Sequence, residues 1–190
     1  MSPRLAALDP PYDPDVAETL RRLMGPGEAD PLKLFRTIAH HRQVLERFRQ
    51  TGSTLLTHTT LDPVERETVI HRVTARAGAE YEWGVHAVVF ARPLGLDDAW
   101  LEATVNGEPE DFADERQRLL VRVADELHDA ATVSDDLYAS LEDHWTGAQI
   151  VELLVLAGFY RLVSYLVNAL AIELEPWAAR FTSTKRSNDG

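Results

Sequence analysis

The sequence predicts an all-α protein, and three features of the chain support this class. Helix-start signals recur: Asp13, Asp30 and Asp62 are each followed by proline, and aspartate caps a helix whose first turn tolerates proline. Behind each signal, apolar residues recur three or four positions apart, as they do on one face of a helix. Near the C-terminus, the apolar stretch from Ala148 to about Leu174 predicts one long helix.

The first part of the chain is predicted to hold two helices. The opening residues are rich in proline and are expected to be irregular. A short helix behind Asp13 is expected to end at the Gly-Pro-Gly sequence at 25–27. The next helix is expected to reach Gly52 with a break at His40-His41, and residues 53–60, rich in Ser and Thr, are expected to link it to a central hairpin.

This hairpin of two helices is predicted in the middle of the chain. Asp62 and Glu65 have the spacing of a capping box, in which each side chain caps the other's backbone N–H. Gly78 follows the last turn of the first helix and suits the left-handed residue that ends it. The second helix is expected to run from Tyr81 to Arg92-Pro93, because proline cannot donate to the preceding turn.

The rest of the chain is predicted to be helical, with capped starts at Asp97, Ser134 and Thr146, the last paired with Gln149 in a capping box. A further helix is expected from roughly Phe112 to Ala130. The residues 106–109 are expected to form a loop between the helix that follows Asp97 and this one. Pro176 is expected to end the last helix. The polar tail from 182 to 190 is expected to be disordered.

Composition excludes several kinds of function. The 190 residues include no cysteine, so the chain has no disulfide, thiol nucleophile, dithiol redox centre or Cys–zinc site, and a cytoplasmic location is expected. The net charge of -12 disfavours a nucleic-acid surface, which needs clustered Lys and Arg. The N-terminus has no apolar run typical of a secretory signal. The long helix carries Glu152 and Arg161, so a core or subunit-interface helix is expected in place of a membrane span.

Polar residues concentrate in the central hairpin. Glu82 and His86 are four positions apart and share a helix face, and Glu67 reaches them if the two helices pack antiparallel. Glu67 lies between Val64 and Ile70 on a face expected to be buried, where a carboxylate needs a partner. A buried Glu–His pair can serve as base and then as acid near neutral pH. The alternative is a surface Glu–His pair of little energetic weight.

This hairpin carries a family resemblance. Glu67, the small-residue corner and the sequence Tyr-Glu-Trp-Gly-Val-His at 81–86 resemble the carboxymuconolactone decarboxylase and AhpD-like family of small all-helical proteins. In the peroxidase branch, a helix glutamate precedes a Cys-x-x-Cys pair, and a histidine follows the second cysteine by four residues. Placing His86 on that histidine places Glu67 on the glutamate, and it places Ala79 and Glu82 where the two cysteines would be.

The resemblance spans roughly residues 55–174 and implies an AhpD-like helical bundle around the hairpin. It divides the chain into an N-terminal helical extension (1–54), an AhpD-like domain (55–181) and the tail (182–190), with the first two forming one compact unit. The last helix has a weak sequence similarity to the hairpin, with Glu152 at the place of Glu67, and this suggests an internally duplicated, two-half arrangement. The family also implies a homo-oligomer, from dimer to hexamer.

For function, the resemblance implies a cofactor-independent lyase or isomerase that acts on a small organic acid or lactone. The expected catalytic residues are His86, Glu67 and Glu82, and the expected substrate-binding residues are Tyr81, Trp83, His58 and Tyr160. No metal or other cofactor, no nucleic acid and no membrane is expected. A metal is disfavoured because the Glu-x-x-x-His spacing of Glu82 and His86 departs from the Glu-x-x-His spacing of helical-bundle metal sites. Alkylhydroperoxidase activity is disfavoured without thiols. The alternative is a non-catalytic helical binding or assembly protein.

Overall fold

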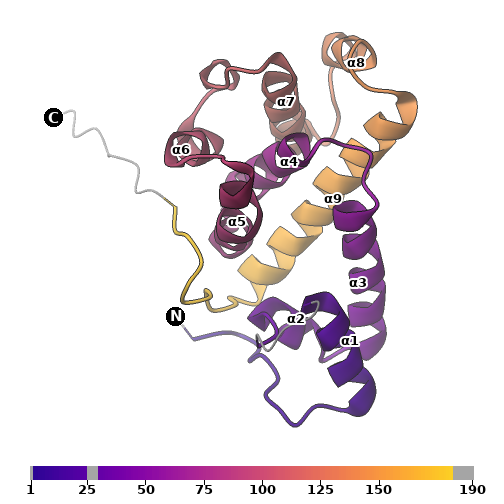
Figure 1. The fold of residues 1–190 in the computed structure, drawn as a ribbon, viewed down its shortest axis with the longest axis vertical. Helices are drawn as coiled ribbons and strands as arrows, with labels where there is room; N and C mark the ends of the chain where they lie inside the picture. The colour runs from indigo at the N-terminus through magenta and orange to yellow at the C-terminus, as the bar shows by residue number, and fades with distance from the viewer. Residues whose placement is uncertain (1, 25–29, 182–190) are drawn as a thin grey trace, which may run out of the picture.

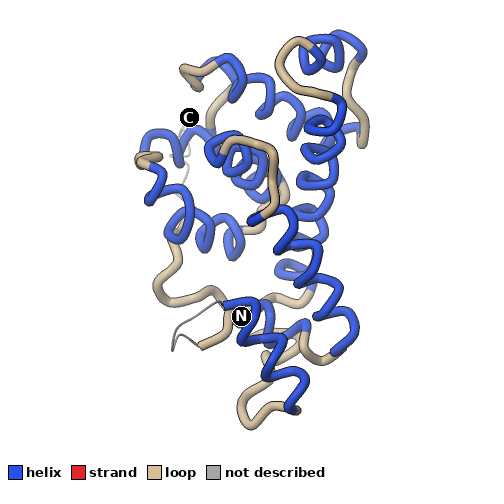
Figure 2. The backbone as a smooth tube through the Cα atoms, turned by 45° about the vertical axis from the view of Figure 1, so that its right-hand side comes forward, coloured by secondary structure: helices blue, strands red, loops and turns tan. Residues whose placement is uncertain are grey.

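The computed structural model describes residues 2–24 and 30–181, and all secondary structure in this part of the chain is helical (Figures 1 and 2). The fold class predicted from the sequence is therefore confirmed. The predicted helix end at 25–27 and the predicted disordered tail lie outside the described residues. The α-helices are α1 (Pro14–Met24), α2 (Lys33–Ile38), α3 (Arg42–Thr57), α4 (Pro63–Arg76), α5 (Glu80–His86), α6 (Asp98–Asn106), α7 (Glu115–Ala130), α8 (Asp135–Glu142) and α9 (Gly147–Ala169). One π-helical turn, η1 (Ala87–Ala91), and two 3₁₀ turns, η2 (Arg92–Leu94) and η3 (Pro109–Asp111), complete the elements.

Helix α4 occupies the centre of the molecule, where it packs against α5, α6, α7 and α9 (Figure 1). Every residue from Glu65 to Thr74 is buried. This stretch includes charged and hydroxyl side chains as well as apolar ones, and buried polar groups must find partners inside the protein. The centre of the fold is therefore also the place where a polar site can form.

The predicted hairpin is present. The capping box of Asp62 and Glu65 starts α4, and Gly78, with φ 63°, follows its C-cap and turns the chain toward α5. The second helix differs from the prediction of one continuous helix to Arg92-Pro93. It is α-helical only to His86 and then widens into the π-helical turn η1. Such turns insert an extra residue into a helix and are frequent at functional sites.

Helices α1 to α3 lie at one end of the molecule and share its core. The aromatic rings of Phe48 in α3 and Phe159 in α9 have centroids 4.9 Å apart, and one apolar cluster extends from Val16 to Ala178. Helix α3 runs through Gly52 to Thr57, so the predicted linker is helical in its first half and the predicted boundary after residue 54 falls inside a helix.

Two features explain this longer helix. A Cβ on Gly52 would lie 3.3 Å from the Phe159 ring, so close packing holds this position in the helix. The helix also accommodates three threonines, because each hydroxyl donates a hydrogen bond to the carbonyl four residues earlier: Thr51, Thr54 and Thr57.

The C-terminal helices follow the predicted order with shifted ends. Helix α7 begins at Glu115, later than the expected start near Phe112, and the Asp114 side chain caps it by accepting from the Gln117 N–H. Thr146 and Gln149 form the predicted capping box of α9. That helix ends at Ala169, well before Pro176, because the chain reverses at Ala171, which has a left-handed φ of 49°.

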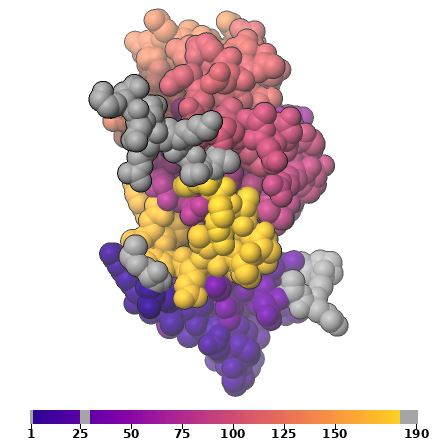
Figure 3. All heavy atoms as spheres, turned by 90° about the vertical axis from the view of Figure 1, so that its left-hand side faces the viewer, coloured from indigo at the N-terminus to yellow at the C-terminus, as the bar shows by residue number. Residues whose placement is uncertain are grey.

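The segment from 170 to 181 then crosses the surface and holds α5 in place. Figure 3 shows it in yellow, between the N-terminal helices (indigo) and the magenta region above. Its Glu175 accepts a hydrogen bond from the Tyr81 hydroxyl (2.6 Å), and Ala179 N–H donates to the carbonyl of Gly84 (3.2 Å). A Cβ on Gly84 would lie 2.1 Å from the Ala179 carbonyl oxygen, so only glycine allows this approach.

Helix α9 also presents an apolar face to solvent. Val151, Val155, Leu162 and Tyr165 lie on one side of it, and each is 46–61% exposed. Among the described residues, α9 is the one helix long and apolar enough to cross a bilayer, and 44% of its apolar 18-residue stretch is buried inside the protein. The core helix of a soluble protein meets the same criteria of length and composition.

Candidate functional site

The centre of the candidate site is a buried carboxylate–imidazole pair. Glu67 on α4 has no exposed surface, and His86, the last residue of α5, is 3% exposed. Nδ1 of His86 lies 2.8 Å from Oε2 of Glu67, so the ring donates a hydrogen bond to the carboxylate. The capped start of α4 and the glycine turn after it place the two helices so that residues nineteen positions apart meet.

Glu67 has two further partners on its own helix. Nε of Arg66 donates to Oε1 (3.1 Å), and Nδ1 of His71 lies 3.7 Å from Oε2. Burial alone would raise the pKa of the Glu67 carboxyl, but His86, His71 and Arg66 outweigh it and lower this pKa below its usual range. Glu67 is therefore ionised at neutral pH.

The second imidazole nitrogen faces another carboxylate. Nε2 of His86 lies 3.5 Å from Oε1 of Glu82, one helical turn earlier, and Oε2 of Glu82 is buried with no hydrogen-bond partner among the described residues. Burial would lower the pKa of His86, but the Glu67 and Glu82 carboxylates together raise it to about 9. At neutral pH the ring is thus an imidazolium that holds a proton on Nε2, the nitrogen turned away from Glu67.

Aromatic side chains enclose the imidazolium. Phe90, on the π-helical turn, stacks on it with ring centroids 4.6 Å apart and an interplanar angle of 26°. Tyr160 of α9 meets it edge-on at 5.1 Å. Burial and the nearby Glu82 and Glu67 raise the pKa of the Tyr160 hydroxyl well above its usual value, so this group stays protonated. Tyr160 is the one predicted substrate-binding residue that contacts His86.

The other three predicted substrate-binding residues lie elsewhere. The Tyr81 hydroxyl bonds Glu175 and accepts from the N–H of Leu34, so it fastens the C-terminal segment. Trp83 lies on the side of α5 that faces α6. Its indole N–H donates to the Thr104 hydroxyl, and its ring belongs to a separate apolar cluster. His58 is exposed at the C-cap of α3, where the helix extension carries it, and it bonds Thr57.

Two residues at the centre were missed in the sequence. His71 is fully buried between the Trp83 and Trp100 rings, and its Nδ1 donates to the Glu67 carbonyl (2.8 Å). Burial lowers the pKa of His71 to about 4, so it is neutral at pH 7, and its Nε2 has no partner among the described residues. The sequence did contain a signal for His71: it lies four residues after Glu67, so the two side chains share one face of the helix. Arg66 was missed because an arginine beside a buried position usually faces solvent.

The two arginines near the end of α4 are paired with carboxylates outside the site. Arg72 forms a two-pronged ion pair with Asp125 at 2.7 and 2.8 Å, and Arg76 bonds Asp129. Arg66 is the guanidinium next to the pair, and it also lies 5.8 Å over the Phe90 ring. Positive charge is therefore present at the site, and Arg66 provides it. Glu152, at the place of the duplicated glutamate, bonds Thr60 on the surface side of α9.

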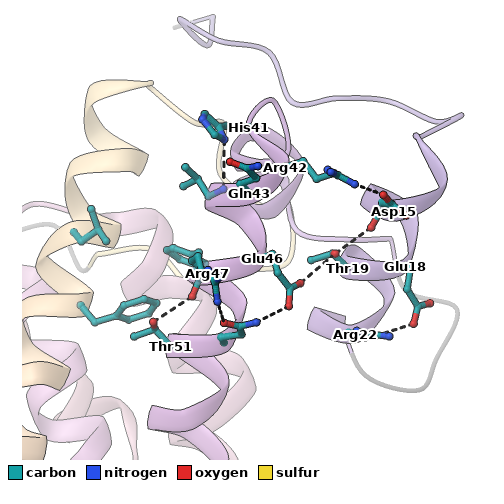
Figure 4. Close-up of a pocket in the computed structure, with 15 residues that line it drawn as sticks. Asp15, Glu18, Thr19, Arg22, His41, Arg42, Gln43, Glu46, Arg47 and Thr51 are labelled. Atoms are coloured by element: carbon teal, nitrogen blue, oxygen red, sulfur yellow. Dashed lines mark hydrogen bonds and ion pairs between the residues drawn. The ribbon is translucent and has the colours of Figure 1, made fainter.

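A large groove lies away from this centre. It has a volume of about 1020 Å³ and runs between α1, α3 and the end of Phe159 on α9 (Figure 4). Its charged side chains pair with one another, as Arg42 does with Asp15 and Arg22 with Glu18. None of the predicted catalytic residues lines it. Among the described residues, no group of three or more His, Asp and Glu side chains is arranged to hold a metal ion.

The arrangement of helices and the hairpin define the class of protein: an all-helical protein with the AhpD-like fold. An uncharacterized peroxidase-related protein from a Silicibacter species matches over 90% of this chain and 92% of its own, with a TM-score of 0.76 and 21% identity. A protein of unknown function from Agrobacterium tumefaciens, proposed as the antioxidant defence protein AhpD, matches over 73% of this chain and 94% of its own, with a TM-score of 0.66 and 16% identity. No protein-family model and no curated protein matches the sequence. The predicted resemblance is thus confirmed at the level of the fold.

Proposed function

We propose that this protein is a cofactor-independent lyase or isomerase that acts on a small organic acid or lactone, with His86 as its proton donor and acceptor. The observation that carries the proposal is the buried pair of His86 and Glu67, hydrogen-bonded at 2.8 Å in the centre of the fold. A histidine in water has both protonation states near pH 7, whereas this one is held as imidazolium by two carboxylates.

A resting imidazolium suits the second half of a decarboxylation. When a substrate loses CO₂, the C–C bond breaks and its electron pair passes into an adjacent carbonyl as an enolate. The Nε2 proton of His86 then forms the new C–H bond at the carbanion carbon, and solvent returns the proton to the ring. Glu67 holds Nδ1 and offsets the charge throughout, and this positioned proton transfer contributes about 10²–10⁴-fold in rate.

Charge at the centre also favours an acidic substrate of limited size. Arg66 provides a guanidinium beside Glu67, and it donates to the Leu56 carbonyl as well as to that carboxylate. A substrate carboxylate that reached Arg66 would lie next to the imidazolium. Glu82, with one unpaired oxygen, opposes a second negative group at Nε2, so a monoanion is preferred.

Peroxidase chemistry is a poor fit despite the descriptions of the two related structures. Alkylhydroperoxide reduction by a dithiol needs a thiolate nucleophile, and the sequence contains no cysteine. Ala79 and Glu82 occupy the positions that the resemblance assigns to the thiols. The deep burial of His86 and Glu67 also favours a second candidate: a helical binding or assembly protein in which the pair is structural.

The experiment that tests the proposal measures CO₂ release from a panel of small carboxylated lactones and β-keto acids in D₂O. We expect turnover of at least one monoanion, with one deuterium in the product, and a loss of about 10²–10⁴-fold in His86→Asn. The matched control is His40→Asn, because His40 is exposed and its ring bonds the Ala6 carbonyl, away from the His86 centre.

Two results would count against the enzyme. Full activity in His86→Asn would remove His86 from the chemistry. Absence of turnover over the whole panel, together with a marked loss of stability in His86→Asn, would favour the binding protein in which the pair is structural.

A further inference from the structure

A second cavity, separate from the His86 centre, lies between α4, α7 and α9. Its volume is about 340 Å³, at the lower end of the range for small-molecule sites. Most of its wall is apolar and includes Val73 of α4, Leu127 of α7 and Leu154 of α9. Leu154 is 38% exposed, so the cavity opens to solvent along α9.

One end of this cavity is polar. Nη1 of Arg161 lies 2.8 Å from Nδ1 of His128, and because a guanidinium only donates, this nitrogen of His128 accepts and the ring proton sits on Nε2. Nε of Arg161 donates to the Tyr165 hydroxyl (3.2 Å), and the guanidinium also lies over the Tyr165 ring at 5.2 Å. Arg161 and Nε2 of His128 thus present donors at the same end of an apolar cavity.

The charge at this end is not neutralised by the residues around it. Within the described chain, no carboxylate forms an ion pair with Arg161. The two acids on α7 whose charges act on His128, Asp125 and Asp129, are paired with Arg72 and Arg76. Burial is the main cause that lowers the pKa of His128; Arg161 and Arg76 lower it further, and Asp129 and Asp125 oppose the shift only in part. A bound anion would relieve this repulsion.

We propose that this cavity binds a small amphipathic carboxylate, with its apolar body among Val73, Leu127 and Leu154 and its carboxylate on Arg161 and His128. A charge-assisted bond from a guanidinium to a carboxylate is about twice as strong as a neutral hydrogen bond. The apolar wall adds the transfer free energy of the ligand's methylene groups. None of His86, Glu67, Glu82 and Tyr160 lines the cavity, so this site is independent of the proposed reaction.

Gly158 provides a clean way to close the cavity. It is exposed on α9, it lines the cavity, and a Cβ built on it meets no atom within 4 Å. A larger side chain there therefore fills open space without a clash in the fold, and replacing a mid-helix glycine favours the helix. Gly158→Leu should occupy the room of the ligand's body, and Arg161→Gln should remove the charge that holds its head.

The experiment is calorimetric titration of the full-length protein with octanoate, with 1-octanol as the uncharged probe of the same length and benzoate as a short aromatic acid. We expect octanoate to bind with a Kd of about 0.1–1 mM and octanol to bind more weakly, with a Kd above about 1 mM. Gly158→Leu should weaken octanoate binding by at least about 10-fold, and Arg161→Gln should weaken octanoate by about 10-fold while leaving octanol unchanged. Val151→Leu, an exposed change on the same helix that does not line the cavity, is the matched control.

NMR of the histidine side chains locates the ligand. Octanoate should shift the His128 ring signals and leave those of His86 unmoved, and tight benzoate binding with no octanoate binding would assign the cavity to aromatic acids instead of aliphatic ones. The proposal is overturned if neither octanoate nor benzoate shows saturable binding up to about 10 mM, or if both cavity variants bind octanoate as the wild type does. Circular dichroism and thermal unfolding show that each variant is folded. Shifts at His86 alone would place the ligand at the proposed active site, which separates failure here from the outcome for the enzyme.

Discussion

Replacing Glu67 by glutamine should convert His86 from an imidazolium into a neutral imidazole. Oε1 of Glu67 accepts from Arg66 and Oε2 accepts from His86, so the carboxylate serves two donors. A glutamine has one oxygen. If that oxygen keeps the bond to Arg66, the amide nitrogen must face Nδ1 of His86 and donate to it, which is possible only when Nδ1 carries no proton.

The size of the effect follows from the pKa of His86. It stands at about 9 against an ordinary value of 6.5, and this difference corresponds to about 3 kcal/mol in favour of the charged ring. Burial acts in the opposite direction, so the carboxylates contribute more than the net difference, and Glu67 is the stronger of the two. With Glu82 alone left, we expect the pKa of His86 to fall from about 9 to below its ordinary value of 6.5.

The assay is a pH titration of the imidazole signals by NMR on protein with labelled histidine, with His86→Asn used to assign the signal. The wild-type signal should titrate near pH 9, and that of Glu67→Gln below pH 6.5. A His86 that still titrates near pH 9 in Glu67→Gln would refute the reasoning, because a group other than Glu67 would then raise the pKa of His86.

Stability gives an independent check on the same pair. The folded-state pKa of His86 lies above its unfolded value, so the native state binds more protons between pH 6.5 and about 9, and stability is full below this window and falls as pH rises through it. Glu67→Gln should lose this slope in urea unfolding. It should also be less stable than the wild type at pH 7, by about 1–3 kcal/mol, because Arg66 loses a charged acceptor.

Four further predictions concern other parts of the structure. His71 is buried and neutral with a pKa of about 4, below its unfolded value of 6.5, so stability should rise with pH between these values, and His71→Leu should flatten this rise in urea unfolding by up to about 3 kcal/mol. Gly84→Ala should lower the thermal midpoint, since overpacking costs about 1–3 kcal/mol, whereas Gly158→Ala should not; equal midpoints would contradict the close approach of the C-terminal segment. Enzymatic activity should survive EDTA and thiol-alkylating reagents, and activity lost on chelation and restored by zinc or manganese would show a required metal. Light scattering should find an oligomer, and Leu162→Glu or Tyr165→Glu on the exposed face of α9 should lower its mass; a wild-type monomer at micromolar concentration would argue against assembly.

The parts of the fold that could be predicted are those with local signals. Asp62 with Glu65, Gly78, and Thr146 with Gln149 fix helix ends through neighbouring residues, and they lie where the sequence places them. The approach of Glu67 to His86 was also predictable, because a short turn between two helices leaves few ways to pack them.

Other features depend on distant contacts. Helix α3 passes Gly52 because Phe159, far along the chain, packs against it, and α9 ends early because the chain reverses to reach α5. Tyr81 belongs to the sequence motif of the hairpin, yet its hydroxyl donates a hydrogen bond to Glu175 and does not face His86. Position in the sequence could not separate it from Tyr160, which faces His86.

The C-terminal segment has a consequence for how the protein is made. The bond between Tyr81 and Glu175 joins residues 94 positions apart, and that between Glu80 and the Phe181 N–H joins residues 101 apart. Chains are synthesised at about 5–20 residues per second, so the helix that carries His86 waits several seconds for the residues that fasten it. During translation, α5 therefore lacks its final support until the segment has left the ribosome. A ribosome stalled before residue 175 should hold a nascent chain whose earlier helices are compact while the pair of His86 and Glu67 is still exposed to solvent.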